Sequence, residues 1–196
     1  MILSSRIKNM TKKLLSDNWY RLETFSYEYK KNDGTWETQH REAYDRGNGA
    51  AILLYNVVQK TVVVTRQFRL PTYINGNKDG MMIEVCAGLL DGDAPEACIK
   101  KEVEEETGFR VDAVTKVFES YMSPGSVTEI LYFFTAPYTH EMKVSEGGGA
   151  DDETENIEVL EMSFTEAIER VASGEIKDAK TILLLQYAQL HIPELL

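Results

Sequence analysis

The sequence predicts a mixed α/β fold in which helices pack on a sheet, preceded by a small β arm. Three observations support this prediction. The amino-terminal part alternates apolar with polar side chains, the middle contains short β-branched runs, and the carboxy-terminal part carries helical apolar patterns. The order is strands, helix, strands and helices, which is typical of helices packed on a mixed sheet.

Each expected element follows from its own pattern. Trp19–Tyr29 alternates and Asn32-Asp33-Gly34 marks a tight turn, so we expect a β-hairpin that continues through 36–43. The later strands are expected at Ala51–Val58, Thr61–Phe68, Met82–Ala87, Asp112–Tyr121, Thr128–Ala136 and Ile157–Ser163. Helices are expected between Asp93 and Gly108, at Phe164–Ser173, and at Ala179–Gln189 with Ile182, Leu183, Tyr187 and Leu190 on its apolar face.

Composition limits the partners of the chain. Its 196 residues and 43% hydrophobic content suit one core, and we expect an arm over residues 1–45 and a main domain over 46–196. No apolar segment reaches the length of a membrane span, and charge interrupts the amino terminus early, so we expect no membrane partner and a cytoplasmic protein. A net charge of −11 without a basic stripe argues against nucleic acid. Cys86 and Cys98 are predicted to be reduced, partly buried thiols.

The segment 88–109 holds the most informative acids. We expect Asp93 to cap a helix that Gly108 ends. At about 100° per residue, its acids divide between two sides. Those predicted to share one face, within roughly 100°, are Glu102, Glu105 and Glu106, whereas Glu104 points nearly the opposite way.

Carboxylates gathered on one helix face repel each other, so a cation is expected beside them. An oxygen-only ligand set favours Mg²⁺, with Mn²⁺ as the alternative, over zinc, and Mg²⁺ readily shares its coordination shell with substrate phosphates. The other interpretation of the same run is a solvated, Glu-rich helix face.

The order of residues from Gly88 to Phe109 resembles the signature box of the Nudix hydrolases. The matching helix positions are Lys101, Glu102, Val103, Glu105, Glu106, Gly108 and Phe109. Lys101 stands where the family usually has arginine, and Asp93 replaces a glutamate and lies one residue closer to Gly88 than usual. Four further segments resemble the GDP-mannose pyrophosphatase branch, namely residues 15–19, 41–50, 73–77 and 121–125.

The resemblance implies an α/β/α sandwich with a mixed sheet, preceded by an amino-terminal β-hairpin arm. It also implies Mg²⁺-dependent hydrolysis of the diphosphate bond of a nucleoside diphosphate sugar, with GDP-mannose giving GMP and mannose 1-phosphate. The close alternative is an ADP-ribose pyrophosphatase giving AMP and ribose 5-phosphate, because Pro124 occurs in both branches. A non-catalytic nucleotide-sugar binding module is the second alternative, and the intact acids of the helix argue against it.

The metal site implied by the resemblance consists of Glu102, Glu106 and the main-chain carbonyl of Ala87, with Glu105 as a further candidate. Glu106 is also a catalytic candidate, together with one acid from residues 145–156, which we expect to be a mobile loop. Counting back from Ile157-Glu158-Val159 gives Glu155, which we favour, and counting from Gly147-Gly148-Gly149 gives Glu153. A merely solvated acidic loop is the alternative.

The resemblance places the substrate between two groups of residues. Those expected from the main domain are Arg69, Ala87, Gly88, Leu89, Glu129 and Lys180. Those expected from the arm of a partner subunit are Trp19, His40, Arg41 and Glu42, which implies a homodimer with an exchanged arm. Trp19 replaces a usual tyrosine and retains the ability to stack on a base, whereas His40 replaces a lysine and its permanent charge. The alternatives are a solvated Arg69, a surface Lys180 and an exposed strand acid at Glu129.

Overall fold

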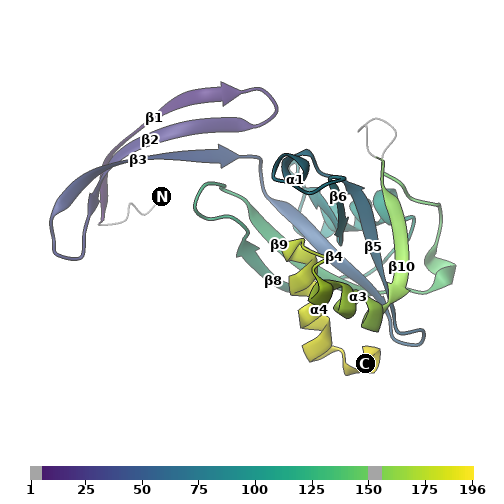
Figure 1. Ribbon diagram of the computed structural model, residues 1–196. Helices are drawn as coiled ribbons and strands as arrows, with labels where there is room; N and C mark the ends of the chain where they lie inside the picture. The colour runs from purple at the N-terminus through teal and green to yellow at the C-terminus, as the bar shows by residue number, and fades with distance from the viewer. Residues whose placement is uncertain (1–5, 150–155) are drawn as a thin grey trace. The chain divides into compact units, whose positions relative to one another are not determined.

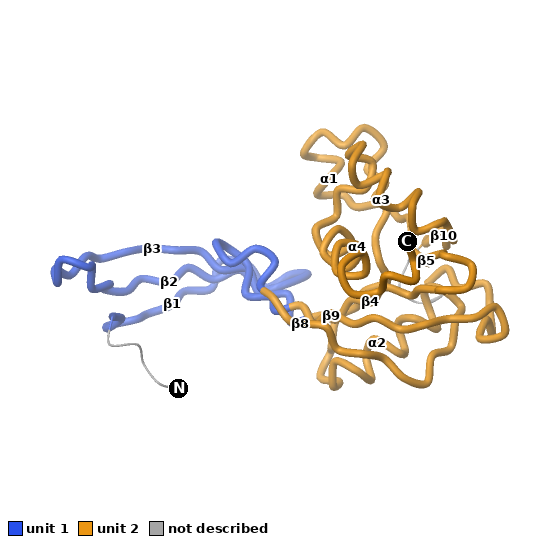
Figure 2. Tube along the Cα trace, turned by 90° about the horizontal axis from the view of Figure 1, so that it is seen from below, with its two compact units in different colours: residues 1–48, 121–130 blue, residues 49–120, 131–196 orange. Residues whose placement is uncertain are grey.

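The computed structural model describes residues 6–149 and 156–196, and the chain divides into two compact units (Figure 2). Unit 1 comprises residues up to 48 together with 121–130, and unit 2 comprises 49–120 and 131–196. The segment 121–130 belongs to unit 1 because Tyr44 donates to the carbonyl of Ser126 (2.8 Å) and accepts from the amide of Thr128 (3.1 Å). The division at residue 45 expected from the sequence did not include this segment and stays a prediction.

Unit 1 contains a three-stranded antiparallel sheet of β1 (Ile7–Asp17), β2 (Arg21–Lys30) and β3 (Trp36–Asp45), with β2 in the centre (Figure 1). The predicted hairpin is confirmed in β2 and β3, which pair without interruption from Arg21 opposite Asp45 to Lys30 opposite Trp36. The strand β1 was missed. Its register shifts twice, between Lys8 and Thr11 and between Leu14 and Ser16, and such irregularities break the period-two pattern that identifies a strand.

The sheet of unit 1 is thinly covered. Every residue of its three strands is exposed or half-buried, and none is fully buried. A sheet normally gains stability by burying one face against another layer. The described residues of this chain therefore leave the sheet without the buried face that an independently stable sheet has.

Unit 2 contains a mixed sheet. Its main strands follow the order β10-β5-β4-β9-β8, with β6 added to β5 and β7 to β4. Their bounds are β4 Gly49–Asn56, β5 Thr61–Phe68, β6 Met81–Glu84, β7 Cys86–Leu89, β8 Thr115–Tyr121, β9 Ile130–Pro137 and β10 Glu158–Ser163. The pair β4 and β9 is parallel, whereas β5 runs antiparallel to both β4 and β10. The predicted mixed sheet is confirmed.

The single strand predicted over Met82–Ala87 is wrong, because the structure divides it at Val85. The amide of Val85 donates to Thr181 Oγ1 (2.8 Å), a side chain outside the sheet. On either side of this break, β6 pairs with β5 and β7 pairs with β4. The chain thus changes partner strands immediately before the acidic segment.

Helices cover both faces of this sheet. They are α1 (Leu70–Ile74), α2 (Pro95–Glu102), α3 (Phe164–Ser173) and α4 (Ala179–His191), with the π-helical turn η1 (Val103–Thr107) and the 3₁₀ turns η2 (His140–Met142) and η3 (Pro193–Leu195). In Figure 2, α2 and α4 lie on opposite sides of β4. Alternate residues of β4, among them Ile52 and Leu54, pack with Ile99 and Val103, and the intervening residues face the other layer. The predicted α/β/α sandwich is confirmed.

The predicted apolar face of α4 is wrong. The buried residues are Thr181, Leu184, Leu185 and Ala188, whereas Leu183 is 38% and Leu190 77% exposed. Apolar side chains occur on all sides of this helix, so the sequence pattern does not determine which side faces the sheet. Contacts with the sheet fix the rotation instead, together with the cap at Asp178, which accepts from the amide of Thr181 (2.9 Å). Within the described ranges, no helix is long and apolar enough to cross a membrane.

Candidate active site

The acidic helix starts one residue later than predicted. The residue that caps α2 is Ala94, without a side-chain hydrogen bond, so the prediction of Asp93 as cap is wrong. Pro95 occupies the first helical position, where its fixed φ favours the helix and its missing N–H leaves no donor unpaired. The predicted stop at Gly108 is confirmed, since this residue has φ of 77°.

The end of this helix differs from a regular α-helix. Val103–Thr107 form a π-helical turn, in which each residue rotates the chain by less than in an α-helix. Glu106 becomes buried at 2% exposure, whereas the Glu105 side chain is 33% exposed and pairs with Lys101 (3.2 Å). Glu104 pairs with Arg110 away from this cluster, as the sequence indicated.

Glu106 lies under β7. Its Oε2 accepts from the amide of Ala87 (3.3 Å), and β7 itself is held in place by pairing with β4, with Ala87 opposite Ala51. Burial raises the pKa of the neighbouring Cys86 thiol, and the negative charge of Glu106 raises it further. Cys86 and Cys98 are both free, as predicted, but they are fully rather than partly buried. Cys98 Sγ donates to the carbonyl of Leu89 (3.2 Å).

Glu102 lies against Gly88. A Cβ placed on Gly88 would fall 2.0 Å from Glu102 Oε1 and 2.1 Å from Cδ, so the carboxylate occupies the space that any other residue at position 88 would fill. Glu102 and Glu106 thus approach the same short strand from one helix. Two carboxylates and a backbone carbonyl at Ala87 form an oxygen donor set that suits a hard divalent cation.

This set of oxygen donors suits a metal ion that also keeps water or substrate oxygens as ligands. Within residues 6–149 and 156–196, no three acidic, cysteine or histidine side chains are grouped so that they could hold a metal ion. Mg²⁺ bound to proteins usually retains waters and substrate phosphate oxygens rather than an all-protein cage. Glu102, Glu106 and the Ala87 carbonyl offer oxygen donors of the kind taken by a divalent ion that shares its coordination shell with water and phosphate.

A glycine loop is fastened to the end of the acidic helix. Gly148 donates to the carbonyl of Glu106 (2.9 Å) and Gly149 to that of Glu105 (3.1 Å), which satisfies carbonyls that a helix end leaves unpaired. The contact is close, because a Cβ on Gly147 would lie 2.4 Å from the carbonyl oxygen of Glu106. The predicted loop acids Glu153 and Glu155 lie outside the described residues.

A buried charge network adjoins the acidic helix. Glu84, whose side chain is 4% exposed, accepts from Arg69 Nε (2.8 Å) and Arg69 Nη2 (3.1 Å), and it also accepts from Lys180 Nζ. Lys180 Nζ donates in addition to Asp178 (2.9 Å). The sequence reasoning missed Glu84. A lone acid in the apolar run of 81–87 was the available signal, because buried charges need partners.

The network keeps Glu84, Lys180 and Arg69 charged. Burial by itself raises the pKa of Glu84, but the charges of Lys180 and Arg69 outweigh this effect and lower it to about 2. Burial lowers the pKa of Lys180, yet Glu84 and Asp178 outweigh it and the pKa is raised above its ordinary value. Arg69 behaves likewise, and the charge of Glu106 contributes to raising its pKa. Arg69 therefore interacts electrostatically with Glu106 of the acidic helix.

The two cations differ in exposure. The Arg69 side chain is 41% exposed and can meet a ligand, whereas Lys180 is 14% exposed and is no surface lysine. The alternatives given by the sequence, a solvated Arg69 and a surface Lys180, disagree with these contacts. The two cations can bind a phosphate group. The carboxylates of Glu102 and Glu106 can bind a divalent metal ion.

The other predicted substrate residues belong to unit 1. Trp19 is 82% exposed in the turn between β1 and β2, Arg41 and Glu42 are exposed on β3, and His40 Nδ1 lies 2.8 Å from Ser26 Oγ. Glu129 precedes β9 and pairs with Arg46 (3.5 Å), with its side chain 14% exposed. Arg69, the segment 87–89 and Lys180 belong to unit 2.

This fold carries an acidic helix packed against Gly88, with two cations beside it. Together these features define the class of the protein as a hydrolase of phosphate anhydrides. A family model described as "NUDIX domain" matches residues 45–185. The chain therefore belongs to the Nudix family and is a Nudix hydrolase. Residues 6–44 match the "GDP-mannose pyrophosphatase NudK N-terminal domain". Nudix hydrolases generally use divalent metal ions.

Individual relatives agree with this family. The chain is 56% identical to a GDP-mannose pyrophosphatase of Yersinia enterocolitica over 189 residues, covering 96% of this chain and 98% of that protein. It is 54% identical to a GDP-mannose pyrophosphatase of Klebsiella pneumoniae, covering 95% and 93%. A solved structure titled as an ADP compounds hydrolase superposes with a TM-score of 0.69 at 17% identity, covering 93% and 91%, which supports the fold alone.

Proposed function

We propose that this protein hydrolyses the diphosphate bond of GDP-mannose in a Mg²⁺-dependent reaction, giving GMP and mannose 1-phosphate. Relatives that cover nearly the whole chain at 54–56% identity carry the name GDP-mannose pyrophosphatase. The observation that carries the proposal is the packing of Glu102 on Gly88 and of Glu106 on Ala87, beside the cations that Glu84 holds. ADP-ribose hydrolysis is the alternative that the same site chemistry allows.

The chemical demands of the reaction match these residues. A diphosphate repels nucleophiles, so its cleavage needs cations on the phosphates and an oriented water. Bound Mg²⁺ supplies charge neutralisation and lowers the pKa of a bound water. Glu102, Glu106 and the Ala87 carbonyl would hold the ion, with Glu105 as a further candidate. Arg69 would donate in bidentate fashion to a phosphate.

Proton transfer and product formation involve the remaining acids. The attacking water forms a bond to one phosphorus while the bond from that phosphorus to the bridging oxygen breaks. We assign the group that orients this water, or takes its proton, to Glu155, with Glu153 as the alternative. The glycine loop fastened to Glu105 and Glu106 supports this assignment, because it anchors the chain that leads to both acids.

The remaining contacts are assigned to a second copy of the chain. Trp19, His40, Arg41 and Glu42 would reach the substrate from the arm of a partner subunit, and Glu129 would contact it near β9. The thin burial of β1–β3 supports a homodimer, since a second copy would cover a sheet that this chain leaves exposed. We further propose that the enzyme acts in the cytoplasm.

The decisive experiment measures products from GDP-mannose and ADP-ribose in parallel, with Mg²⁺ and with EDTA. Glu106→Gln should lower kcat for GDP-mannose by roughly 10²–10³-fold. Glu104→Gln is the matched control, because it changes an acid on the same helix that pairs with Arg110 instead. Preference for ADP-ribose would move the chain to the other branch, and turnover in EDTA would overturn the metal-dependent reaction.

A further inference from the structure

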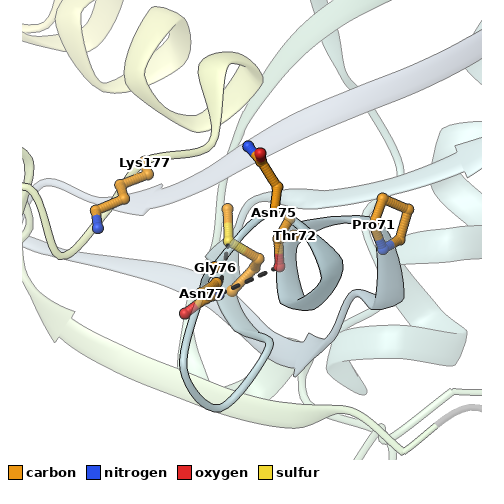
Figure 3. Close-up of a pocket in the computed structure, with 7 residues that line it drawn as sticks. Pro71, Thr72, Asn75, Gly76, Asn77 and Lys177 are labelled. Carbon is orange, nitrogen blue, oxygen red and sulfur yellow. Dashed lines mark hydrogen bonds between the residues drawn. The ribbon is translucent and has the colours of Figure 1, made fainter.

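A hollow of about 530 Å³ in unit 2 has no role in the site described above. It lies between α1 with the loop that follows it and the segment that leads into α4 (Figure 3). Polar side chains that line it are Thr72, Asn75, Asn77 and Lys177, and Met82 contributes an apolar wall. Its volume is in the range of roughly 300–1,000 Å³ found for small-molecule sites.

One wall of the hollow is held rigidly. The side-chain amide of Asn77 donates to Thr72 Oγ1 (3.2 Å) and to the carbonyl of Met81 (3.0 Å). Thr72 Oγ1 in turn donates to the carbonyl of Arg69 (2.9 Å), and the Arg69 amide donates to Gly80 (2.8 Å). Hydrogen bonds within the loop of residues 69–80 therefore hold its shape, and a ligand would not have to order it.

Two side chains that line the hollow take no part in the hydrogen bonds that hold the loop. Among the described residues, the side chains of Asn75 and Lys177 have no hydrogen-bond or ion-pair partner, and both residues are exposed. In Figure 3, the amide of Asn75 extends away from α1, and Lys177 lies on the segment across from it. The hollow thus offers an amide that donates and accepts, and an ammonium group that donates.

The hollow shares its supporting elements with the cations of the site. Met82 and Glu84 lie two residues apart on β6, so they share one face of the strand at roughly 7 Å along it. Glu84 holds Arg69 and Lys180, Thr72 is bonded to Arg69, and Lys177 precedes Lys180 by three residues. The hollow and the cations of the site are thus built on the same elements, namely the loop of residues 69–80, β6 and the segment 177–180.

We propose that the hollow is the subsite for the hexose end of the substrate, with Asn75 and Lys177 bonding the sugar hydroxyls. This assignment rests on the proposed function. Sugar hydroxyls both donate and accept, which matches an amide and an ammonium group. The lining contains no aromatic side chain, whereas nucleobases are commonly held by stacking on aromatic rings. The hexose is therefore the better match than the guanine.

The test measures binding of mannose 1-phosphate and, separately, of GMP by calorimetry with Mg²⁺ present. Asn75→Ala and Lys177→Met should each weaken mannose 1-phosphate binding at least fivefold and leave GMP binding unchanged. The matched controls are Ile74→Ala and Lys78→Met, which alter exposed neighbours outside the lining and should change neither. A thermal melt of each variant confirms that it is folded.

Each outcome separates this inference from the proposed function. If the wild type hydrolyses GDP-mannose but both variants bind mannose 1-phosphate normally, the subsite is overturned and the function stands. If both variants lose GMP binding equally, the hollow does not distinguish the sugar and the inference is again overturned. If the wild type does not hydrolyse GDP-mannose, yet binds mannose 1-phosphate through Asn75, the function fails and the subsite stands.

Discussion

Glu84 and Lys180 are 96 residues apart in the sequence and form a hydrogen-bonded ion pair in the interior of unit 2. Glu84 ends β6, and Lys180 lies in the first turn of α4, so the pair joins the sheet to the helix. Arg69 donates to both oxygens of the same carboxylate. One buried acid therefore positions both cations that the family resemblance places at the substrate.

Removing the charge of Glu84 should destabilise the protein strongly. Glu84→Gln leaves Arg69 and Lys180 without their shared counter-ion, and breaking a buried pair in this way costs about 3–5 kcal/mol. Urea unfolding at pH 7 measures the change. Glu169→Gln, at an exposed position of α3, is the control and should stay within about 0.5 kcal/mol of the wild type. Equal midpoints for the two variants would contradict the prediction.

The same pair predicts a pH dependence. The pKa of folded Glu84 is about 2, below its ordinary value of 4.5, so its contribution is fully present above the ordinary value. It should be lost as the pH falls from 4.5 towards 2, by an amount on the order of 3 kcal/mol. Unfolding free energies of wild type and Glu84→Gln should therefore converge over this window. Parallel curves would show that the carboxylate does not titrate there.

A side chain at position 88 should disturb the metal site without disturbing the fold. Gly88→Ala places a Cβ 2.0 Å from Glu102 Oε1, so the flexible carboxylate must move. Affinity for Mn²⁺, measured by titration calorimetry, should fall at least tenfold, with little change in the melting temperature. Gly125→Ala, where a Cβ meets nothing within 4 Å, is the matched control. Unchanged Mn²⁺ affinity in Gly88→Ala would remove Glu102 from the metal site.

The glycine loop can be tested through Gly147. Gly147→Ala is strained twice, because its φ is 69° and its Cβ would lie 2.4 Å from the carbonyl oxygen of Glu106. Gly92→Ala shares a positive φ of 96° but meets open space, so it reports the backbone strain alone, about 1–2 kcal/mol. Gly147→Ala should lose more unfolding free energy than this control and should also lower kcat. Equal losses would show that the loop tolerates displacement from the helix.

The exchanged arm predicts complementation between inactive variants. If Arg41 acts in the site of the partner subunit, Arg41→Ala and Glu106→Gln chains can combine into a dimer with one intact site. An equal mixture, unfolded and refolded together, should recover roughly a quarter of wild-type activity. Each variant refolded alone is the control. No recovery, with light scattering showing dimers of the 22.3 kDa chain, would place Arg41 and Glu106 in the same subunit's site.

Local patterns in the sequence were sufficient wherever the chain interacts mainly with its neighbours. The hairpin of β2 and β3, the strands β4 and β5, the bounds of α3 and the stop at Gly108 all follow from alternation, periodicity and backbone preference. Glu104 was also separated correctly from the buried acid Glu106. The signature order of residues identified the family for the same reason, because the box is a continuous stretch of chain.

Tertiary contacts decided the rest. The division of 81–89 at Val85, the rotation of α4 and the π-helical turn that buries Glu106 depend on partners elsewhere in the chain, which periodicity does not reveal. Glu84 gained its importance only when folding brought Arg69 and Lys180 to one carboxylate. The sequence by itself determined the fold class, the family and the acids. Only the folded chain decided which charges are buried together, because desolvation and ion pairing depend on distance in space and not on distance along the chain.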